Sequence, residues 1–100
     1  MTLCCKTTQH GEESLKAALH PYDLTCRPQL VTETMNNHYY DLINCFGKRT
    51  GVYALLNTSF NLHGLPIVSS LLDAHHVMEN SMLDGIILDS HIYLRQITSY

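Results

Sequence analysis

Hydrogen-bonding side chains are concentrated in one short segment of the chain. Five of seven consecutive positions carry such groups: Asn57, Thr58, Ser59, Asn61 and His63. Hydroxyls and carboxamides are neutral donors, which can bind phosphate oxygens without introducing a further charge. Ser59 and Asn61 are two residues apart, so an extended backbone places them on the same side. We therefore expect a phosphate-binding loop led by these two residues; the alternative is a polar turn that caps a strand.

Apolar residues precede this loop, and a turn-forming glycine follows its polar positions. Residues 52–56 read Val-Tyr-Ala-Leu-Leu, which predicts a buried strand. Loops at the ends of core strands carry ligand chemistry in α/β folds, because the sheet fixes the loop while its polar groups stay free. Gly64 permits a positive φ angle or a close approach to the backbone. Asn57 and Thr58 either contact the ligand or satisfy backbone groups of the loop, and His63 is either a contact or solvent-facing.

Arg27 is the one arginine between Pro21 and Pro28. A guanidinium can bind a carboxylate, a carbamate or a phosphate through two parallel hydrogen bonds. The alternative is a surface ion pair with Asp23 or a neighbour, which would contribute less than about 1 kcal/mol. We expect the ligand role, which makes Arg27 the candidate catalytic residue.

Composition limits the classes of partner. The chain has 100 residues, of which 45% are hydrophobic and 15% charged, and its net charge is −3. One hundred residues make one domain at most, and the six Lys and Arg are scattered, so nucleic acid is not expected as a partner. Neither a membrane span nor a signal peptide is present in the sequence pattern. A sparse charge count also predicts that part of the surface is covered by something else.

The cysteine and histidine patterns predict free thiols and no metal. Cys4, Cys5, Cys26 and Cys45 have no Cys-x-x-Cys spacing, which favours reduced thiols in a cytoplasmic protein. His75 and His76 would point about 100° apart on a helix, which makes a shared ion unfavourable. No metal is expected in this segment.

The N-terminal half is predicted to contain a loose end, two helices and a strand. Residues 1–11 show no periodicity, and residues 12–19 favour a short helix. Residues 29–34 form a plausible strand. A second helix begins at Asn36 or Asn37, with Tyr39, Leu42, Ile43 and Phe46 at helical spacing, and ends between Gly47 and Gly51.

The C-terminal half is predicted to contain a helix and a hairpin. Ser70, with Asp73 three residues on, predicts a capped helix that runs to about Asn80. Residues 84–88 and 92–97 are expected to form two strands joined by a turn at Asp89 and Ser90. The order of strand, helix, strand, loop, helix and hairpin predicts an α/β sandwich with mixed sheet pairing.

The loop and its flanks resemble the C-terminal domain of the carbamoyltransferase family that includes the nodulation and antibiotic O-carbamoyltransferases. That family has a signature close to Asn-Thr-Ser-Phe-Asn-x-x-Gly-Glu-Pro-Ile-Val, which residues 57–68 match with Leu65 in place of Glu. Flanking matches follow in the expected order: Asp23-Leu24-Thr25-Cys26-Arg27-Pro28-Gln29, Asn37-x-Tyr39-Tyr40, Thr50-Gly51, Asp73-Ala74 and Leu83-Asp84. The resemblance runs from about His20 to Arg95. We therefore divide the chain into residues 1–19, an N-terminal extension or domain edge, and residues 20–100, a partial carbamoyltransferase C-terminal domain.

The resemblance implies a YrdC-like fold, a twisted open mixed sheet with packed helices. It also places a strand leading up to His20, in place of the short helix over residues 12–19. In such relatives a Thr-Ser-x-Asn-x-x-Gly loop touches nucleotide phosphates, and residues 58–64 match that pattern. Arg27 falls on the family's Thr-x-Arg-x-Gln pattern, which begins at Thr25. His20 and Asp23 lie near the corresponding family residues with one extra residue in the spacing, so His20, Asp23 and Thr25 are further candidates.

The resemblance also implies an enzyme that forms carbamoyl adenylate from ATP and carbamoyl phosphate and transfers the carbamoyl group to a hydroxyl. ATP is expected as a substrate, and the acceptor and any iron site belong to an N-terminal carbamoyltransferase domain acting in cis or in trans. The basic segments that the family places upstream are absent from these residues, so the chain alone is expected to be inactive. The alternative is a non-catalytic remnant or interaction module. The absent upstream segments favour it, as do Leu65 and Leu71, where the family usually carries Glu and Pro.

Overall fold

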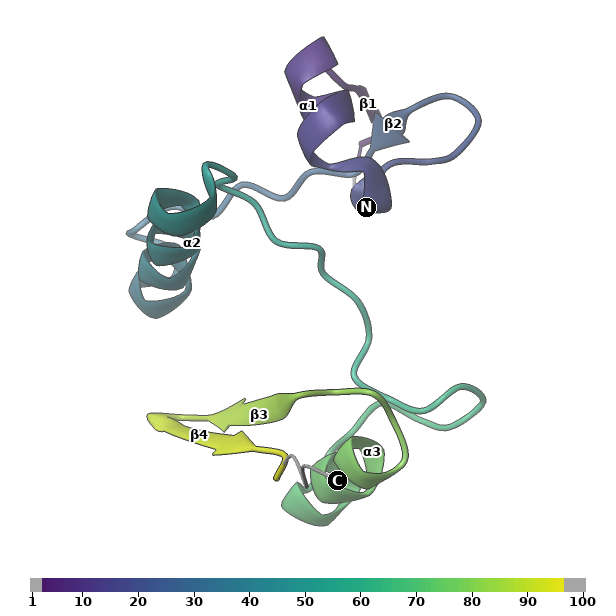
Figure 1. Cartoon of the computed structure of the whole chain (residues 1–100), viewed down its shortest axis with the longest axis vertical. Coiled ribbons are helices and arrows are strands. Elements are labelled where there is room, and N and C mark those ends of the chain that lie inside the picture. The colour runs from purple at the N-terminus through teal and green to yellow at the C-terminus, as the bar shows by residue number, and fades with distance from the viewer. Residues whose placement is uncertain (1–2, 97–100) are drawn as a thin grey trace. The chain divides into compact units, whose positions relative to one another are not determined.

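The computed structural model describes residues 3–96 of the chain, which divide into two compact units. The first unit is Met1–Asn57 and the second is Thr58–Tyr100. The first contains α1, β1, β2 and α2, and the second contains α3, β3 and β4 (Figure 1). Each unit is described below by itself.

A short strand pair and a helix form the beginning of the first unit. β1 (Cys5–Lys6) pairs antiparallel with β2 (Thr25–Cys26), and Cys5 lies opposite Cys26. α1 (Gln9–Ser14) begins at Thr8, whose hydroxyl accepts a hydrogen bond from the backbone N–H of Gly11 at 3.2 Å. The expectation of a loose segment over residues 1–11 is therefore wrong where β1 and α1 lie, because both depend on partners that local periodicity does not reveal.

The helix expected over residues 12–19 is only partly present. α1 ends at Ser14, and a 3-10 turn, η1 (Lys16–Ala18), continues the chain to Leu19. Neither a full helix nor the strand that the family resemblance favours before His20 is formed. Leu19 is the buried hydrophobic residue of this region.

α2 (Asn37–Thr50) confirms the predicted second helix. The Asn36 side chain accepts from the backbone N–H of Tyr39 at 3.1 Å and satisfies one of the free donors of the first turn. Gly51, with φ of 80°, ends the helix, and its N–H donates to the carbonyl of Gly47 at 2.8 Å. Lys48 and Arg49 lie in the last turn, where the helix dipole favours positive charge.

The two strands predicted beside α2 are absent from the described part of the chain. Residues 29–34 and residues 52–56 have no strand pairing, and Leu55 and Leu56 are exposed. Tyr53 instead lays its ring against the buried Gly47 of α2, where an added Cβ would lie 2.3 Å from the ring. A strand needs a neighbour for its backbone N–H and C=O groups, and the described residues provide none for these segments.

α3 (Leu71–Glu79) confirms the helix predicted in the second half of the chain. The Ser70 hydroxyl accepts from the N–H of Asp73 at 3.1 Å. In return, an Asp73 carboxylate oxygen accepts from the Ser69 N–H at 3.4 Å and from the Ser69 hydroxyl at 3.3 Å. This arrangement is similar to a capping box, except that the Asp73 carboxylate accepts from Ser69, the residue before the cap. The buried residues of the helix are Ala74 and Val77.

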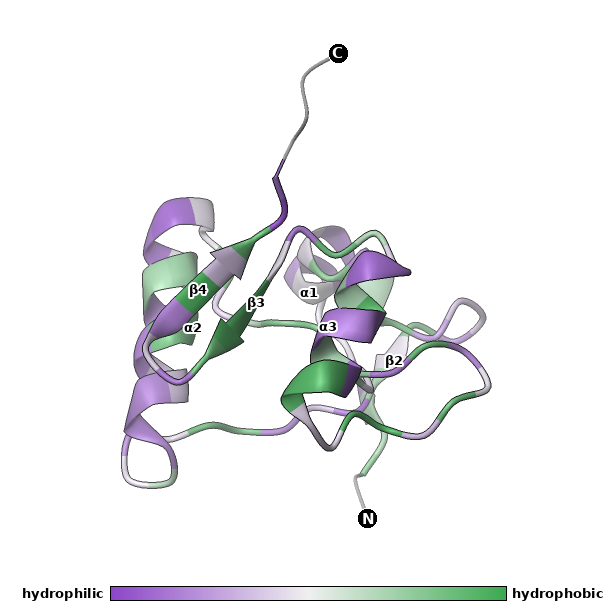
Figure 2. Cartoon of the chain, turned by 90° about the horizontal axis from the view of Figure 1, so that it is seen from below, coloured by the Kyte–Doolittle hydropathy of each residue, from purple (hydrophilic) through white to green (hydrophobic). Residues whose placement is uncertain are grey.

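The predicted hairpin is also present. β3 (Gly85–Leu88) pairs antiparallel with β4 (His91–Leu94), and Ile87 lies opposite Ile92. Asp89 has a positive φ of 54°, which the two-residue turn requires of its first residue. Ile97, the expected end of the second strand, lies outside the described residues. Figure 2 shows that β3 is almost continuously hydrophobic.

Arg95 connects the hairpin to α3. Its backbone N–H donates to the carbonyl of Asp84 at 2.8 Å, which extends the pairing of the hairpin. One terminal nitrogen of its guanidinium donates to the carbonyls of Met78 and Ser81, the latter at 2.8 Å. These carbonyls lie at the negative end of α3, where a cation is stabilised.

The chain therefore has an α/β fold. Its described residues contain three α-helices and two separate two-stranded antiparallel sheets. The mixed pairing expected from the sequence does not form among these residues, because the segments predicted to supply its further strands remain unpaired.

Candidate functional site

The candidate site residues fall in both units. His20, Asp23, Thr25 and Arg27 belong to the first unit, whereas Thr58, Ser59, Asn61 and Gly64 belong to the second and Asn57 ends the first. The structure brings His20, Asp23 and Thr25 together and closes the loop around Asn61. The two groups are described in turn.

Backbone hydrogen bonds close the polar loop on itself. The N–H of Val68 donates to the carbonyl of Phe60 at 2.9 Å, and the N–H of Leu65 donates to the carbonyl of Leu62 at 3.0 Å. Gly64, the third residue of this inner turn, has φ of +81°. A type II turn requires a positive φ at that position, so Gly64 serves the shape of the loop. The positive φ expected from the sequence is confirmed.

The Asn61 side chain fixes the interior of the loop. Its amide nitrogen donates to the carbonyl of Leu65 at 2.9 Å and to the carbonyl of Leu62 at 3.0 Å. Both amide hydrogens are thereby used by the backbone of the loop. Its oxygen, Oδ1, is buried and finds no partner among residues 3–96. The Asn61 side chain is therefore fixed by the backbone of the turn, and its oxygen keeps a free acceptor position among the described residues.

Asn57, Thr58 and Ser59 are exposed at the entrance to this loop. They belong to no helix or strand. Asn61 was predicted to act with Ser59 as a direct donor to phosphate. It differs from Ser59 because it is half-buried and donates to the Leu65 carbonyl. The structure therefore separates the two residues: Asn61 is hydrogen-bonded to the loop backbone, whereas Ser59 is exposed.

A shallow cavity of about 240 Å³ lies between the loop and α3. Its lining includes Leu65, Pro66 and Val68 from the loop and His76 and Val77 from α3. These groups are mainly apolar, which does not favour a phosphate.

Asp73 adds a negative charge to the wall of that cavity. Hydrogen bonding with the Ser70 hydroxyl, followed by that from the Ser69 backbone N–H, holds the pKa of Asp73 below its usual value. The carboxylate therefore stays ionised at neutral pH and occupies the N-terminal end of α3 itself. This charge opposes the binding of an anion in the cavity.

His20, Asp23 and Thr25 form a hydrogen-bonded cluster in the first unit. His20 Nδ1 lies 3.2 Å from Asp23 Oδ1, which also accepts from the Thr25 hydroxyl at 2.7 Å and from the Thr25 N–H at 3.1 Å. Hydrogen bonding from Thr25, above all from its hydroxyl, lowers the pKa of Asp23, and the charge of His20 contributes further. An anionic Asp23 favours the His20 tautomer that carries its proton on Nδ1 and leaves Nε2 free as an acceptor.

Arg27 directly follows β2 and is exposed. Within residues 3–96, the ion pair that involves Asp23 is the one with His20. The sequence alternative of an Arg27–Asp23 surface pair is therefore not formed. This leaves the guanidinium of Arg27 accessible to a ligand.

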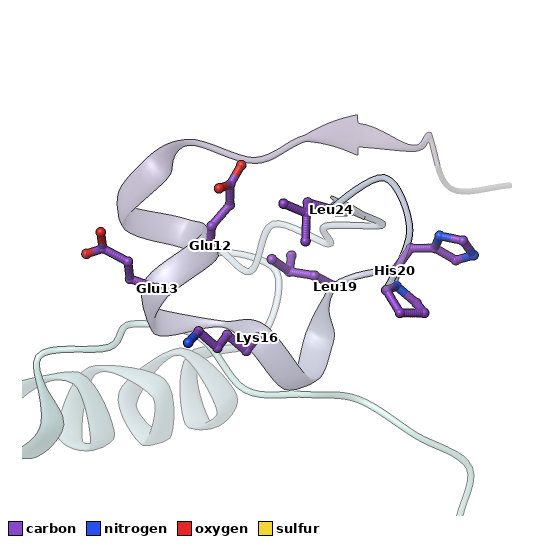
Figure 3. A pocket seen from close by; sticks show the side chains of 7 residues that line it. Glu12, Glu13, Lys16, Leu19, His20 and Leu24 are labelled. Carbon is purple, nitrogen blue, oxygen red and sulfur yellow. The ribbon is translucent and has the colours of Figure 1, made fainter.

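A second cavity, which sequence reasoning did not anticipate, lies beside this cluster. It has a volume of about 370 Å³ and is open to solvent, with Leu19 and Leu24 at its centre and Glu12, Lys16 and His20 along its sides (Figure 3). Leu24 has a positive φ of 54°, and its N–H donates to the carbonyl of His20 at 3.0 Å. Glu12 comes from α1 and Lys16 from η1, and no pattern in the sequence indicated that their side chains would line a common cavity.

The part of the chain that the structure describes shows neither a group of metal ligands nor a membrane-spanning helix. Residues 3–96 contain no cluster of three or more His, Cys, Asp or Glu side chains arranged to hold a metal ion. None of the helices that the structure describes is both long enough and apolar enough to cross a membrane.

The chain belongs to the family of carbamoyltransferase C-terminal domains. The model of the family described as Carbamoyltransferase C-terminus matches residues 1–95. This match confirms the family resemblance found in the loop and its flanks. It also reaches into the residues before His20, beyond the resemblance that the motifs supported.

Relatives from bacteria and an archaeon support this assignment. NolNO, a nodulation protein of Sinorhizobium fredii, is 38% identical over 91 residues, which make up 91% of this chain and 13% of that protein. NolO, a nodulation protein of Bradyrhizobium diazoefficiens, is 44% identical over 80 residues, 80% of this chain and 15% of that protein. An uncharacterised protein of Methanocaldococcus jannaschii is 38% identical over 97% of this chain and 16% of its own length. The chain thus spans a small fraction of the length of the curated relatives it matches.

Proposed function

We propose that this chain is the C-terminal part of an ATP-dependent carbamoyltransferase and contributes to the formation of carbamoyl adenylate. The observation that carries the proposal is the polar loop: Asn57, Thr58 and Ser59 are exposed, and the turn behind them is fixed by Asn61 and Gly64. Exposed neutral donors on an ordered turn suit the oxygens of a nucleotide phosphate. Membership of the carbamoyltransferase family supplies the reaction class.

In the proposed reaction, carbamoyl phosphate reacts with water to give carbamate and inorganic phosphate. A carbamate oxygen then attacks the α-phosphorus of ATP, pyrophosphate leaves, and carbamoyl adenylate is formed. The carbamoyl group finally passes to a hydroxyl acceptor and AMP is released. Negative charge accumulates on phosphate oxygens during the attack, and positioned donors that meet this charge lower the barrier.

Individual residues have distinct roles in this proposal. Ser59, with Thr58 and Asn57, donates hydrogen bonds to the phosphates of ATP, while Asn61 and Gly64 hold the loop in shape. Arg27 binds carbamate or phosphate through its exposed guanidinium. Arg27 lies in the first unit and the loop in the second, so each unit contributes its own ligand-binding groups in this proposal.

His20, Asp23 and Thr25 form the third part of the proposed site. The Asp23 carboxylate accepts from Thr25 and pairs with His20, which orients the imidazole. The cluster is two residues from Arg27 in the sequence and lies on the loop that leads into β2. It therefore positions the backbone that carries Arg27.

The remainder of the enzyme is the proposed partner of this chain, in cis or in trans. Buried hydrophobic residues in the described part are few, namely Leu19, Ala74 and Val77, whereas Ile92 of β4 is 66% exposed and Leu94 is 72% exposed. Apolar faces of this kind are stabilised when another protein surface covers them. An N-terminal carbamoyltransferase portion would cover them, complete a YrdC-like sheet with the unpaired residues 52–56, and supply the cations and the acceptor site.

The second candidate is a non-catalytic interaction module that keeps the fold. Leu65 favours it, because this residue replaces the family's loop Glu and is 50% exposed in the turn. Such a module would bind the same partner surface but would need neither Ser59 nor Arg27 for its function.

The experiment that distinguishes the two is reconstitution. A longer carbamoyltransferase of the family, from which the matching C-terminal segment has been removed, is combined with this chain. Incorporation of labelled pyrophosphate into ATP is then measured with and without carbamoyl phosphate. Exchange that depends on both proteins and on carbamoyl phosphate supports the enzyme, whereas complex formation without exchange supports the interaction module.

A further inference from the structure

Two cysteines that are far apart in the sequence lie directly opposite each other in the first unit. Cys5 of β1 is the register partner of Cys26 of β2. Neighbouring antiparallel strands place opposite Cα atoms about 4.5–5.5 Å apart, which falls within the span of about 4.4–6.8 Å that a disulfide bridges. Side chains of opposite residues lie on the same face of a strand pair. The pair is therefore placed for a cross-strand bond.

The neighbouring cysteine is placed differently. Cys4 precedes Cys5, so its side chain lies on the other face of β1, where its Sγ donates to the Thr25 hydroxyl at 3.1 Å. Cys45 lies in α2, outside the strand pair. Of the four thiols, Cys5 and Cys26 alone share a register position among the paired residues of the described chain.

We propose that Cys5 and Cys26 are a redox modification site that forms an intramolecular disulfide by exchange with a small disulfide such as oxidised glutathione. Cys5 is exposed and Cys26 is half-buried, so Cys5 reacts first. Lys6 and Arg27 adjoin the two cysteines, and these cations attract the carboxylates of glutathione. In a cytoplasmic protein such a bond would be transient and regulatory rather than structural.

The exchange takes place in two steps. The Cys5 thiolate attacks one sulfur of oxidised glutathione, forms a mixed disulfide and releases one glutathione thiolate. The Cys26 thiolate then attacks the Cys5 sulfur, forms the Cys5–Cys26 bond and releases the second glutathione. The protein loses two protons and two electrons, and the disulfide of glutathione is reduced to two thiols.

Closure of this bond would fix β1 beside the backbone that leads to Arg27. The bond would enclose α1, η1 and the His20–Asp23 cluster in one covalent loop. An effect on catalysis depends on the proposed role of Arg27, whereas formation of the bond does not. The test below therefore measures the bond and not the activity.

The test compares two double variants of the full chain, each with one possible bridge to Cys26. Cys4→Ser with Cys45→Ser leaves Cys5 and Cys26, and Cys5→Ser with Cys45→Ser leaves Cys4 and Cys26. Each variant is incubated with oxidised glutathione, once in buffer and once in concentrated urea. Free thiols are then alkylated, and the mass of the chain is measured by mass spectrometry. The chain with the intramolecular bond has lost two hydrogens and retains no glutathione. Peptide mapping of the unaltered chain identifies which cysteines it links.

In buffer we expect the Cys5–Cys26 variant to close at least about ten times faster than the Cys4–Cys26 variant, because only Cys5 meets the geometry of the bond. In urea the two rates should converge, since the two loops differ by one residue and closure entropy changes little with length. Equal rates in buffer would overturn the proposal. So would stable glutathione adducts without closure, or a Cys4–Cys26 bond as the main product in the unaltered chain.

Discussion

The side-chain nitrogen of Asn61 lies 2.9 Å from the carbonyl oxygen of Leu65, across the turn that contains Gly64. This contact makes Asn61 part of the framework of the loop. Ser59, in contrast, is exposed, and the proposed function assigns the phosphate contact to this residue. Ser59 and Asn61 thus share one motif in the sequence but differ in exposure and in hydrogen bonding.

Substitution of Asn61 should destabilise the second unit more than substitution of Ser59. Asn61→Ala removes two hydrogen bonds to loop carbonyls, and each such bond contributes about 1 kcal/mol. Ser59→Ala removes an exposed hydroxyl and should leave the melting temperature unchanged. Hydrogen exchange at the Val68 amide, which closes the loop, measures the difference. Equal protection of this amide in both variants would show that Asn61 does not hold the turn.

Stability should fall in acid through the capping carboxylate of α3. Hydrogen bonding with Ser70 and Ser69 places the pKa of folded Asp73 below its usual value of 3.8. The stabilisation is therefore complete above the unfolded pKa and is lost as the pH falls through the lower folded value. Asp73→Asn should flatten the decline of the melting temperature below about pH 4. Asp41→Asn, which removes an exposed carboxylate of α2, is the control and should leave the decline intact.

The isolated chain should bind ATP weakly. The loop offers neutral donors, while the cations that neutralise phosphate charge are supplied elsewhere in the proposed enzyme. Calorimetry on the chain alone should therefore give no dissociation constant near 1 μM, which would correspond to about −8 kcal/mol. Addition of the remaining part of a family carbamoyltransferase should tighten binding. Micromolar affinity in the chain alone would contradict the assignment of those cations to another part of the enzyme.

The isolated chain should also self-associate. β4 is an edge strand whose Ile92, Tyr93 and Leu94 are all more than half exposed, and an open apolar edge pairs readily with another chain. Sedimentation at micromolar concentration should reveal dimers or larger species. Ile92→Lys should shift the population towards the monomer, because a charge on the edge opposes pairing, whereas Ser90→Lys in the turn should have little effect. A monomer with a sharp, cooperative melt would mean that the chain closes its own core.

Local signals predicted α2, α3 and the hairpin well. Asn36 and Ser70 cap the two helices through their own side chains, and Gly51 ends α2 with a positive φ. Asp89 and Ser90 form the hairpin turn between two apolar strands. In each case the information lies within a few residues of the element, so the sequence pattern is sufficient.

The strand predicted over residues 52–56 does not form, because a strand depends on a partner outside its own segment. An apolar run indicates burial, but it does not identify the strand that would satisfy its backbone, and no partner is present among the described residues. The pairing of Cys5 with Cys26 was missed because both strands are two residues long and join distant segments. Within the candidate site, the motif identified the loop, while the division of roles between Ser59 and Asn61 required the hydrogen bonds.

The pyrophosphate exchange activity of the reconstituted enzyme should fall even when Arg27 is replaced by a residue of the same charge. Arg27→Lys keeps a cation but loses the two parallel donors of the guanidinium. In the reconstituted enzyme we expect pyrophosphate exchange to fall at least about tenfold, a loss of roughly 1.4 kcal/mol in transition-state binding. Arg49→Lys, in the last turn of α2, is the matched control. Pyrophosphate exchange at the unaltered rate in the Arg27→Lys variant would show that the Arg27 guanidinium does not bind the ligand.

The central claim, that the polar loop binds the phosphates of ATP during carbamoyl-adenylate formation, is tested most directly by Ser59→Ala in the reconstituted enzyme. Ser90→Ala, an exposed serine in the hairpin turn, is the matched control. We measure carbamoyl-phosphate-dependent exchange of pyrophosphate into ATP, with a thermal melt of each variant. The account predicts a fall of about tenfold or more for Ser59→Ala at an unchanged melting temperature, and full exchange for Ser90→Ala. Exchange by Ser59→Ala at the unaltered rate would contradict the account and leave the loop with a structural role alone.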